Sequence, residues 1–161
     1  MSRTKNDNVE AFHGYGIHVP TRTIFMGSES SSDYGLDSGT ESGTDHAMAE
    51  RVIKNLHILE QLGNEPIIII MDNIGGDVWH GRAIYDAIKA CRSHVTILVR
   101  GHAMSMGAYI LQAADHRVMS PGAKIMIHYG HISVHGEALT VYKQIDAYKR
   151  EDREMERIFL E

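Results

Sequence analysis

The apolar residues of this chain recur with helical spacing in some segments and form short unbroken runs in others. The clearest helical spacing, with steps of three or four residues, is that of Met48, Val52, Leu56 and Leu59. This spacing predicts an amphipathic helix, with Asp45 as its N-cap and Gly63 at its end. The next segment, PIIIIMD, contains four consecutive isoleucines. Such a run predicts a strand that is covered on both faces, as parallel strands between helices are.

The order of strand, turn and helix then repeats along the chain. The turn NIGGD leads into a predicted helix at residues 78–91, and HVTILVR predicts a second buried strand. The segment MGAYILQAA predicts a short central helix, and RVMS and KIMIHY predict two more strands. This repetition predicts right-handed crossovers and an α/β fold whose sites lie at the carboxyl ends of the strands.

Three segments differ in composition from the rest of the chain. Residues 1–17 are mostly polar and predict a flexible arm, so we expect the folded core at residues 18–136. Within it, residues 28–46 are rich in Ser, Gly and acidic side chains, which predicts a mobile surface insertion. Residues 137–161 predict a long helix that ends in an apolar cluster without a cap. We therefore expect the natural domain to continue past residue 161.

The overall composition narrows the classes of function. A chain of 161 residues with 43% hydrophobic side chains predicts one globular domain. The net charge of −5 argues against a broad basic surface, so we expect no nucleic-acid or membrane partner. Cys91 is the only cysteine, and no apolar run approaches the roughly 20 residues that span a bilayer. We therefore expect a cytoplasmic protein without disulfides.

Ser105 is the candidate nucleophile. It stands between a predicted strand and a predicted helix, in a sharp turn of the kind that exposes a hydroxyl group. Its neighbour Gly107 is small enough for the backbone to approach a substrate carbonyl closely. The alternative interpretation is a serine that merely caps the helix.

A second glycine-bearing turn follows the isoleucine-rich strand. Gly75 and Gly76 could present bare backbone N–H groups to a carbonyl oxygen, as an oxyanion hole requires. The alternative is an ordinary strand-to-helix turn that needs positive φ. Because the two turns lie on adjacent strand–helix units, we expect them to face each other.

His128 is the candidate general base, because it ends the predicted strand KIMIHY and a strand end can hold an imidazole rigidly. A structural or solvent-exposed histidine is the alternative. Together with His131 and His135 it could also suggest zinc, but no carboxylate or thiol completes a recognisable ligand set. We therefore assign no metal.

Several ordered motifs resemble those of one family. From about Arg22 onward, RTIFMG, NIGGDVWHGRAIYDAI, GHAMSMGAYILQAA and RVMSPGAKIMIHYG resemble ClpP, the proteolytic subunit of the ATP-dependent Clp protease. The resemblance implies the ClpP/crotonase-like fold, a spiral of repeated ββα units with a C-terminal handle helix at residues 137–161.

The resemblance also implies a mechanism and partners. Ser105 would attack the peptide carbonyl, His128 would take its proton, and the N–H groups of Gly76 and Met106 would hold the oxyanion. Gly75 and Gly107 would support these groups. The subunit would need no cofactor and would form stacked seven-membered rings. An AAA+ unfoldase such as ClpX or ClpA would use ATP to feed it unfolded polypeptides.

The sequence departs from the family pattern at three places. Ile74 stands where the family's S/N-P-G-G motif has proline, and the acidic insertion replaces a shorter connection. The family's triad aspartate follows the handle helix, so no Asp of this sequence corresponds to it. Loss of that carboxylate would lower kcat by about 10⁴-fold.

Two other functions stay open at this point. The fold is shared with crotonase-type acyl-CoA enzymes, which use comparable glycine turns but not this serine and histidine. A subunit without the aspartate could also be a non-catalytic member of a ring.

Overall fold

The computed structural model describes residues 5–27, 29–30 and 41–160. Two compact units are present, Met1–Met126 and Ile127–Glu161, and each is described by itself. Most of the predicted insertion at residues 28–46 lies outside the described residues. Its described ends form two short antiparallel strands, β3 (Glu29–Ser30) and β4 (Glu41–Ser42).

The first unit is built on a six-stranded sheet in the order β1-β2-β5-β6-β7, with β8 also paired to β6. The strands are β1 (Ile17–His18), β2 (Thr23–Gly27), β5 (Ile67–Asn73), β6 (Val95–Met104), β7 (His116–Met119) and β8 (Lys124–Met126). Within this sheet β1 pairs antiparallel with β2, whereas the pairs β2–β5, β5–β6, β6–β7 and β6–β8 are parallel. The prediction of an α/β fold with repeated strand–helix units is confirmed.

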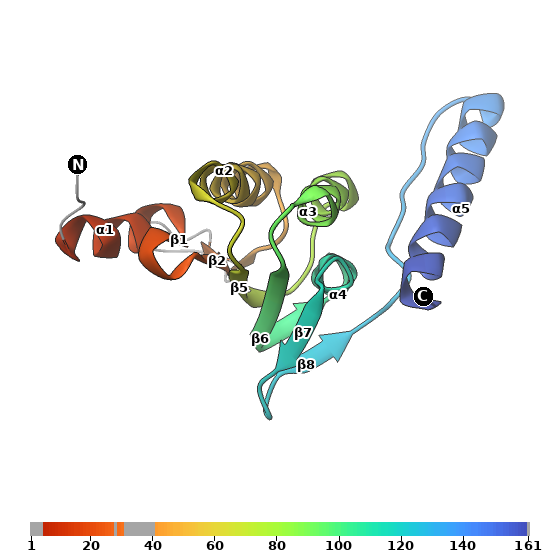
Figure 1. Ribbon diagram of the computed structural model, residues 1–161. Coiled ribbons are helices and arrows are strands. Elements are labelled where there is room, and N and C mark those ends of the chain that lie inside the picture. The colour runs from red at the N-terminus through yellow and green to blue at the C-terminus, as the bar shows by residue number, and fades with distance from the viewer. Residues whose placement is uncertain (1–4, 28, 31–40, 161) are drawn as a thin grey trace. The chain divides into compact units, whose positions relative to one another are not determined.

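The helices of this unit are α1 (Lys5–Tyr15), α2 (His46–Leu62), α3 (Val78–Ala90) and α4 (Met106–Leu111), with a 3₁₀ turn at Val19–Thr21. Figure 1 shows α2, α3 and α4 on the same side of the sheet. Val52 of α2 and Ile84 of α3 share one buried cluster with Ile69 and Ile97 of the central strands. The core of the unit therefore lies between these helices and one face of the sheet.

The prediction that β5 is covered on both faces was wrong. Its side chains alternate between buried and more exposed, and Ile68 is 40% exposed. Phe25 on the neighbouring strand β2 is similarly exposed, at 39%. The reason lies in the order of the strands. The chain crosses the sheet in one direction, from β2 to β5, β6 and β7, so successive right-handed crossovers place their helices on the same face.

Helix α1 was not expected from the sequence, which predicted a flexible arm at residues 1–17. Ala11 of this helix is buried in the core cluster. The ring of Phe12 lies 6.2 Å from that of Phe25, edge to face, and the side-chain amide of Asn55 donates to the carbonyl of Tyr15 at 2.7 Å. These tertiary contacts, rather than helical propensity, fix α1.

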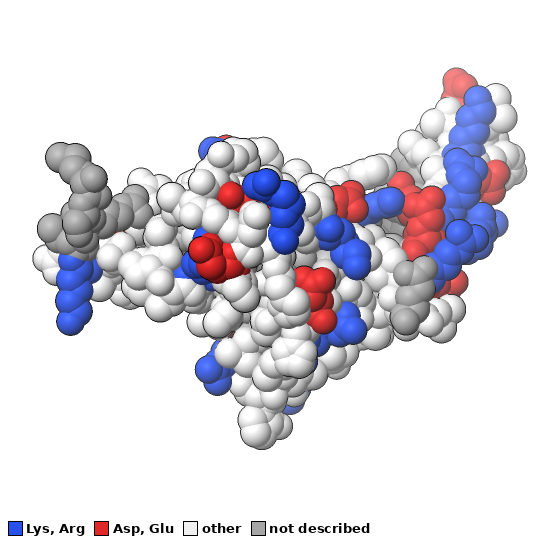
Figure 2. Space-filling view, in the orientation of Figure 1, with Lys and Arg blue, Asp and Glu red and all other residues white. Residues whose placement is uncertain are grey.

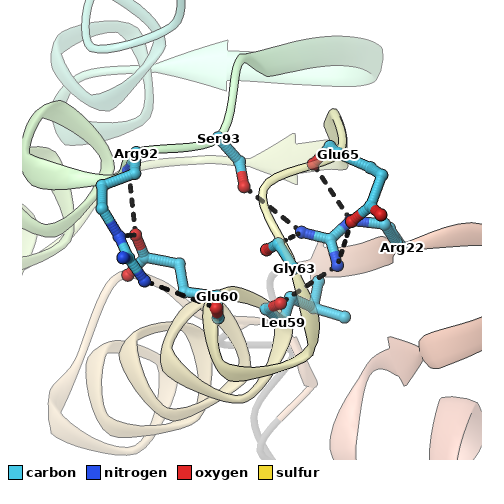
Figure 3. A network of polar contacts seen from close by, with 7 residues as sticks. All are labelled: Arg22, Leu59, Glu60, Gly63, Glu65, Arg92 and Ser93. Atoms are coloured by element: carbon cyan, nitrogen blue, oxygen red, sulfur yellow. Dashed lines mark hydrogen bonds and ion pairs between the residues drawn. The ribbon is translucent and has the colours of Figure 1, made fainter.

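Helix α2 begins and ends where the sequence predicted. The Asp45 carboxylate accepts a hydrogen bond from the Met48 N–H at 2.8 Å, as an N-cap does. At the other end the Arg22 guanidinium donates to the carbonyls of Leu59 and Gly63 at 3.0 and 3.1 Å (Figure 3). Side-chain donors therefore satisfy carbonyls that the end of a helix leaves without partners.

The second unit contains α5 (Ala138–Leu160), which confirms the predicted C-terminal helix. The hydroxyl of Tyr129 donates a hydrogen bond to the Glu156 carboxylate at 2.6 Å. This bond raises the pKa of Tyr129.

None of the helices in the described residues is both long and apolar enough to cross a membrane. On the face shown in Figure 2, basic and acidic side chains are interspersed within each unit.

Candidate active site

The turns after β5 and β6 lie against each other. A Cβ atom added to Gly75 would stand 2.5 Å from the Cβ of Ser105 and 3.0 Å from the backbone nitrogen of Met106. Real Cβ atoms essentially never approach another atom as closely as 2.5 Å, so only glycine fits at position 75. The expectation that the two glycine-bearing turns face each other is confirmed.

Ser105 occupies a strained backbone conformation with φ 51° and ψ −120°. It is one of two non-glycine residues with positive φ among the described residues, the other being Arg22. Its N–H donates to the carbonyl of Met126 on β8 at 2.8 Å, and its own carbonyl accepts from Ala108 at 3.0 Å. The Ser105 side chain makes no capping hydrogen bond to α4, which argues against the simple N-cap interpretation. Strained residues of this kind cluster at functional sites.

The helix after Ser105 is packed tightly against the neighbouring strand and helix. A Cβ atom on Gly107 would lie 2.7 Å from the backbone oxygen of Asn73 on β5. A Cβ atom on Gly81 of α3 would lie 2.4 Å from the methyl carbon of Met106. Close packing on both sides therefore fixes the position of the Met106 N–H relative to the glycine turn.

The Gly75–Gly76 turn is paired on its outer side with Thr44, a contact that the sequence did not predict. The Thr44 N–H donates to the carbonyl of Gly75 at 2.6 Å, and the Asp77 N–H donates to the carbonyl of Thr44 at 2.7 Å. This is a parallel bridge between Thr44 and Gly76. In such pairing the N–H and carbonyl of Gly76 itself are directed to the side away from Thr44.

A second contact that the sequence did not predict lies at the edge of the same turns. The Asp72 carboxylate of β5 accepts a hydrogen bond from the His102 backbone N–H at 2.8 Å and lies 2.9 Å from the His102 Nδ1 atom. The only signal in the sequence for this pair was that Asp72 and His102 each stand near the carboxyl end of a predicted strand, shortly before a glycine- or serine-bearing turn. Within the described parts of the chain, no three His, Cys, Asp or Glu side chains form a group that could hold a metal ion.

His128 lies in the second unit, where its ring centroid is 6.3 Å from that of His131. The predicted strand is shorter than expected, because β8 ends at Met126 and His128 follows in an irregular segment. Met126, the last residue of β8, is the residue whose carbonyl accepts the hydrogen bond from the Ser105 N–H. The role of His128 as a base for Ser105 stays a prediction.

Comparison with known proteins places these turns in a family context. The chain matches the model of the family described as Clp protease over residues 39–161, a range that includes both turns and His128. It is similar to the ATP-dependent Clp protease proteolytic subunit 2 of Pseudomonas aeruginosa, with 33% identity over 125 residues, 74% of this chain and 60% of the relative. It is also similar to the ATP-dependent Clp protease proteolytic subunit of Deinococcus radiodurans, with 36% identity over 92 residues.

The similarity to the Deinococcus radiodurans protein covers 55% of this chain and 45% of that relative. A third relative, the chloroplastic ATP-dependent Clp protease proteolytic subunit 3 of Arabidopsis thaliana, is 32% identical over 110 residues. That alignment covers 66% of this chain and 31% of the plant protein. The chain thus spans about three fifths of the length of the Pseudomonas relative and less of the other two.

Proposed function

The chain belongs to the Clp protease family, and from this we propose that it acts as a serine endopeptidase subunit on unfolded polypeptides. The observation that carries the proposal is the direct packing of Gly75 against Ser105 and Met106. This packing joins a strained serine to a glycine turn whose Gly76 N–H is directed away from Thr44. Acyl transfer requires a nucleophile beside such a backbone donor.

The proposed reaction proceeds through an acyl-enzyme. The Ser105 hydroxyl oxygen attacks the peptide carbonyl while His128 accepts the hydroxyl proton, and the N–H groups of Gly76 and Met106 stabilise the resulting oxyanion. Collapse of this intermediate breaks the C–N bond, and His128 returns the proton to the leaving amine. Water then hydrolyses the ester in the same way and restores the Ser105 hydroxyl.

The names of the relatives, which are proteolytic subunits of ATP-dependent Clp proteases, support a further part of the proposal. We infer a homo-oligomer of stacked seven-membered rings in the cytoplasm, with an AAA+ unfoldase such as ClpX or ClpA as partner. The unfoldase would use ATP, and the proteolytic subunit would need no cofactor of its own.

The test combines fluorophosphonate labelling with hydrolysis of a short fluorogenic peptide. The wild-type chain and the variant Ser120→Ala, which removes a hydroxyl elsewhere in the same unit, should both be labelled. Ser105→Ala should lose labelling and turnover completely, because the nucleophile is gone. Stable rings without labelling would favour the non-catalytic subunit, and labelling that persists in Ser105→Ala would exclude Ser105 as the nucleophile.

A further inference from the structure

We propose that Thr44 and Asn73 are positioning residues that hold the Gly75–Gly76 turn in the conformation needed to bind the oxyanion. The inference rests on the proposed peptidase function and extends it to two side chains outside the Ser105, His128 and glycine set. Both residues are almost completely buried, with 1% of Thr44 and 0% of Asn73 exposed. Buried polar groups are retained when they are hydrogen-bonded, so their partners indicate their role.

The partners of Asn73 all belong to the turn or its support. Its Oδ1 atom accepts a hydrogen bond from the Gly75 N–H at 2.7 Å. Its Nδ2 atom lies 3.1 Å from both the Thr44 hydroxyl and the Met48 sulfur. The side-chain amide of Asn73 therefore links the first glycine of the turn to the start of α2. The backbone oxygen of Asn73 also packs against Gly107.

Thr44 completes the link from the other side. Its backbone holds the carbonyl of Gly75 and the N–H of Asp77, which flank Gly76. Its hydroxyl lies within 3.2 Å of the Asn73 amide oxygen. A change in the Thr44–Asn73 contact therefore acts directly on the two peptide units that set the direction of the Gly76 N–H.

The turn needs such external support because its own residues do not restrict it. Gly75 and Gly76 have φ of 96° and 149°, which glycine reaches easily and leaves as easily. Ile74 precedes them and does not fix its own φ as a proline would. The hydrogen bonds of Asn73 and Thr44, together with the packing of Gly75 against Ser105, consequently select one conformation of the turn.

This arrangement predicts a catalytic effect and not only a structural one. Removal of one oxyanion donor costs about 10²–10³-fold in kcat, so loosening the turn without removing the donor should cost about 10-fold. Because substrate contacts elsewhere are unchanged, kcat should fall while KM stays close to the wild-type value. A role limited to stability would lower the midpoint of unfolding without this separation.

The experiment compares the near-isosteric variant Thr44→Val with Thr44→Ser, which keeps the hydroxyl, and Asn73→Ala. Thr96→Val, on β6 at the other end of the sheet, is the matched control. Measured quantities are kcat, KM, the rate of fluorophosphonate labelling, and amide hydrogen exchange by mass spectrometry in peptides that cover residues 74–77. Exchange of the Gly75 and Asp77 amides should be faster in Thr44→Val and Asn73→Ala than in the wild type.

The inference holds if Thr44→Val loses about 10-fold in kcat and in labelling rate, while Thr44→Ser and Thr96→Val retain wild-type values. Unchanged kcat in Thr44→Val, or an equal loss in Thr96→Val, overturns it. If the wild-type chain itself is not labelled, the proposed peptidase function fails instead. In that case the hydrogen-exchange measurement by itself tests the positioning role. Unchanged exchange at residues 74–77 in both Thr44→Val and Asn73→Ala would refute it.

Discussion

The Asp72 carboxylate holds His102 by two contacts, one to the backbone N–H at 2.8 Å and one to the imidazole Nδ1 atom at 2.9 Å. The pair lies where the register of β5 and β6 shifts, since Met71 pairs with Val99 but Asn73 pairs with Ala103. A Cβ atom on Gly101 would lie 2.4 Å from the same carboxylate. Asp72 therefore fills the irregularity in β6 that precedes the turn at Ser105.

We predict that Asp72→Ala lowers both the stability of the first unit and the labelling rate of Ser105. The His102 N–H would lose its acceptor, which costs about 1 kcal/mol for a half-exposed group. Asp72→Asn keeps an acceptor oxygen and should retain most of the stability. Urea unfolding and the fluorophosphonate labelling rate would measure the two effects, and equal stability of Asp72→Ala and wild type would contradict the assigned role.

Gly75→Ala should abolish labelling of Ser105. Its new methyl group would lie 2.5 Å from the Cβ of Ser105 in a backbone conformation with φ 96°, so the two turns would have to separate. We expect a loss of more than about 10²-fold, comparable to removal of an oxyanion donor. The control is Gly122→Ala, because a Cβ atom at Gly122 meets nothing within 4 Å. A labelling rate in Gly75→Ala that matches this control would show that the contact is not required.

Arg22→Lys should destabilise the first unit although it preserves the charge. The guanidinium donates to four groups on three segments of the chain, namely Leu59, Gly63, Glu65 and Ser93. Lysine lacks the rigid fork that makes these bonds together, and the loss of two or three of them should cost about 2–3 kcal/mol. Arg100→Lys, which changes an exposed arginine that donates to the Ser120 hydroxyl at 3.4 Å, is the control in urea unfolding. Equal midpoints for the two variants would be the contrary result.

The features predicted correctly from the sequence depend on residues close together in the chain. Asp45 and Gly63 mark the ends of α2 because capping is local, and the two glycine turns follow directly from their positions between strands and helices. Coverage of β5 could not be predicted, since an isoleucine run does not show on which face the crossover helices lie. The contact between Thr44 and Asn73 joins residues 29 positions apart, and nothing in either local sequence indicates it.

The Glu60–Arg92 contact predicts a pH dependence of stability (Figure 3). The Arg92 N–H donates to the Glu60 carboxylate at 2.8 Å, and this bond lowers the pKa of Glu60 in the folded state, against the opposing effect of burial. The folded pKa is thus below the unfolded one, so the ionised carboxylate stabilises the fold at pH values above the unfolded pKa of about 4.3. That stabilisation is lost as pH falls through the lower, folded pKa.

Glu60→Gln removes this titration while retaining an oxygen that can accept the Arg92 N–H. We therefore expect the wild type to exceed the variant in free energy of unfolding near neutral pH, and the difference to shrink as the pH is lowered below about 4.3. Urea unfolding of both proteins over a pH series measures the difference directly. A difference that stays constant across the series would mean that ionisation of Glu60 does not contribute to the stability of the folded chain.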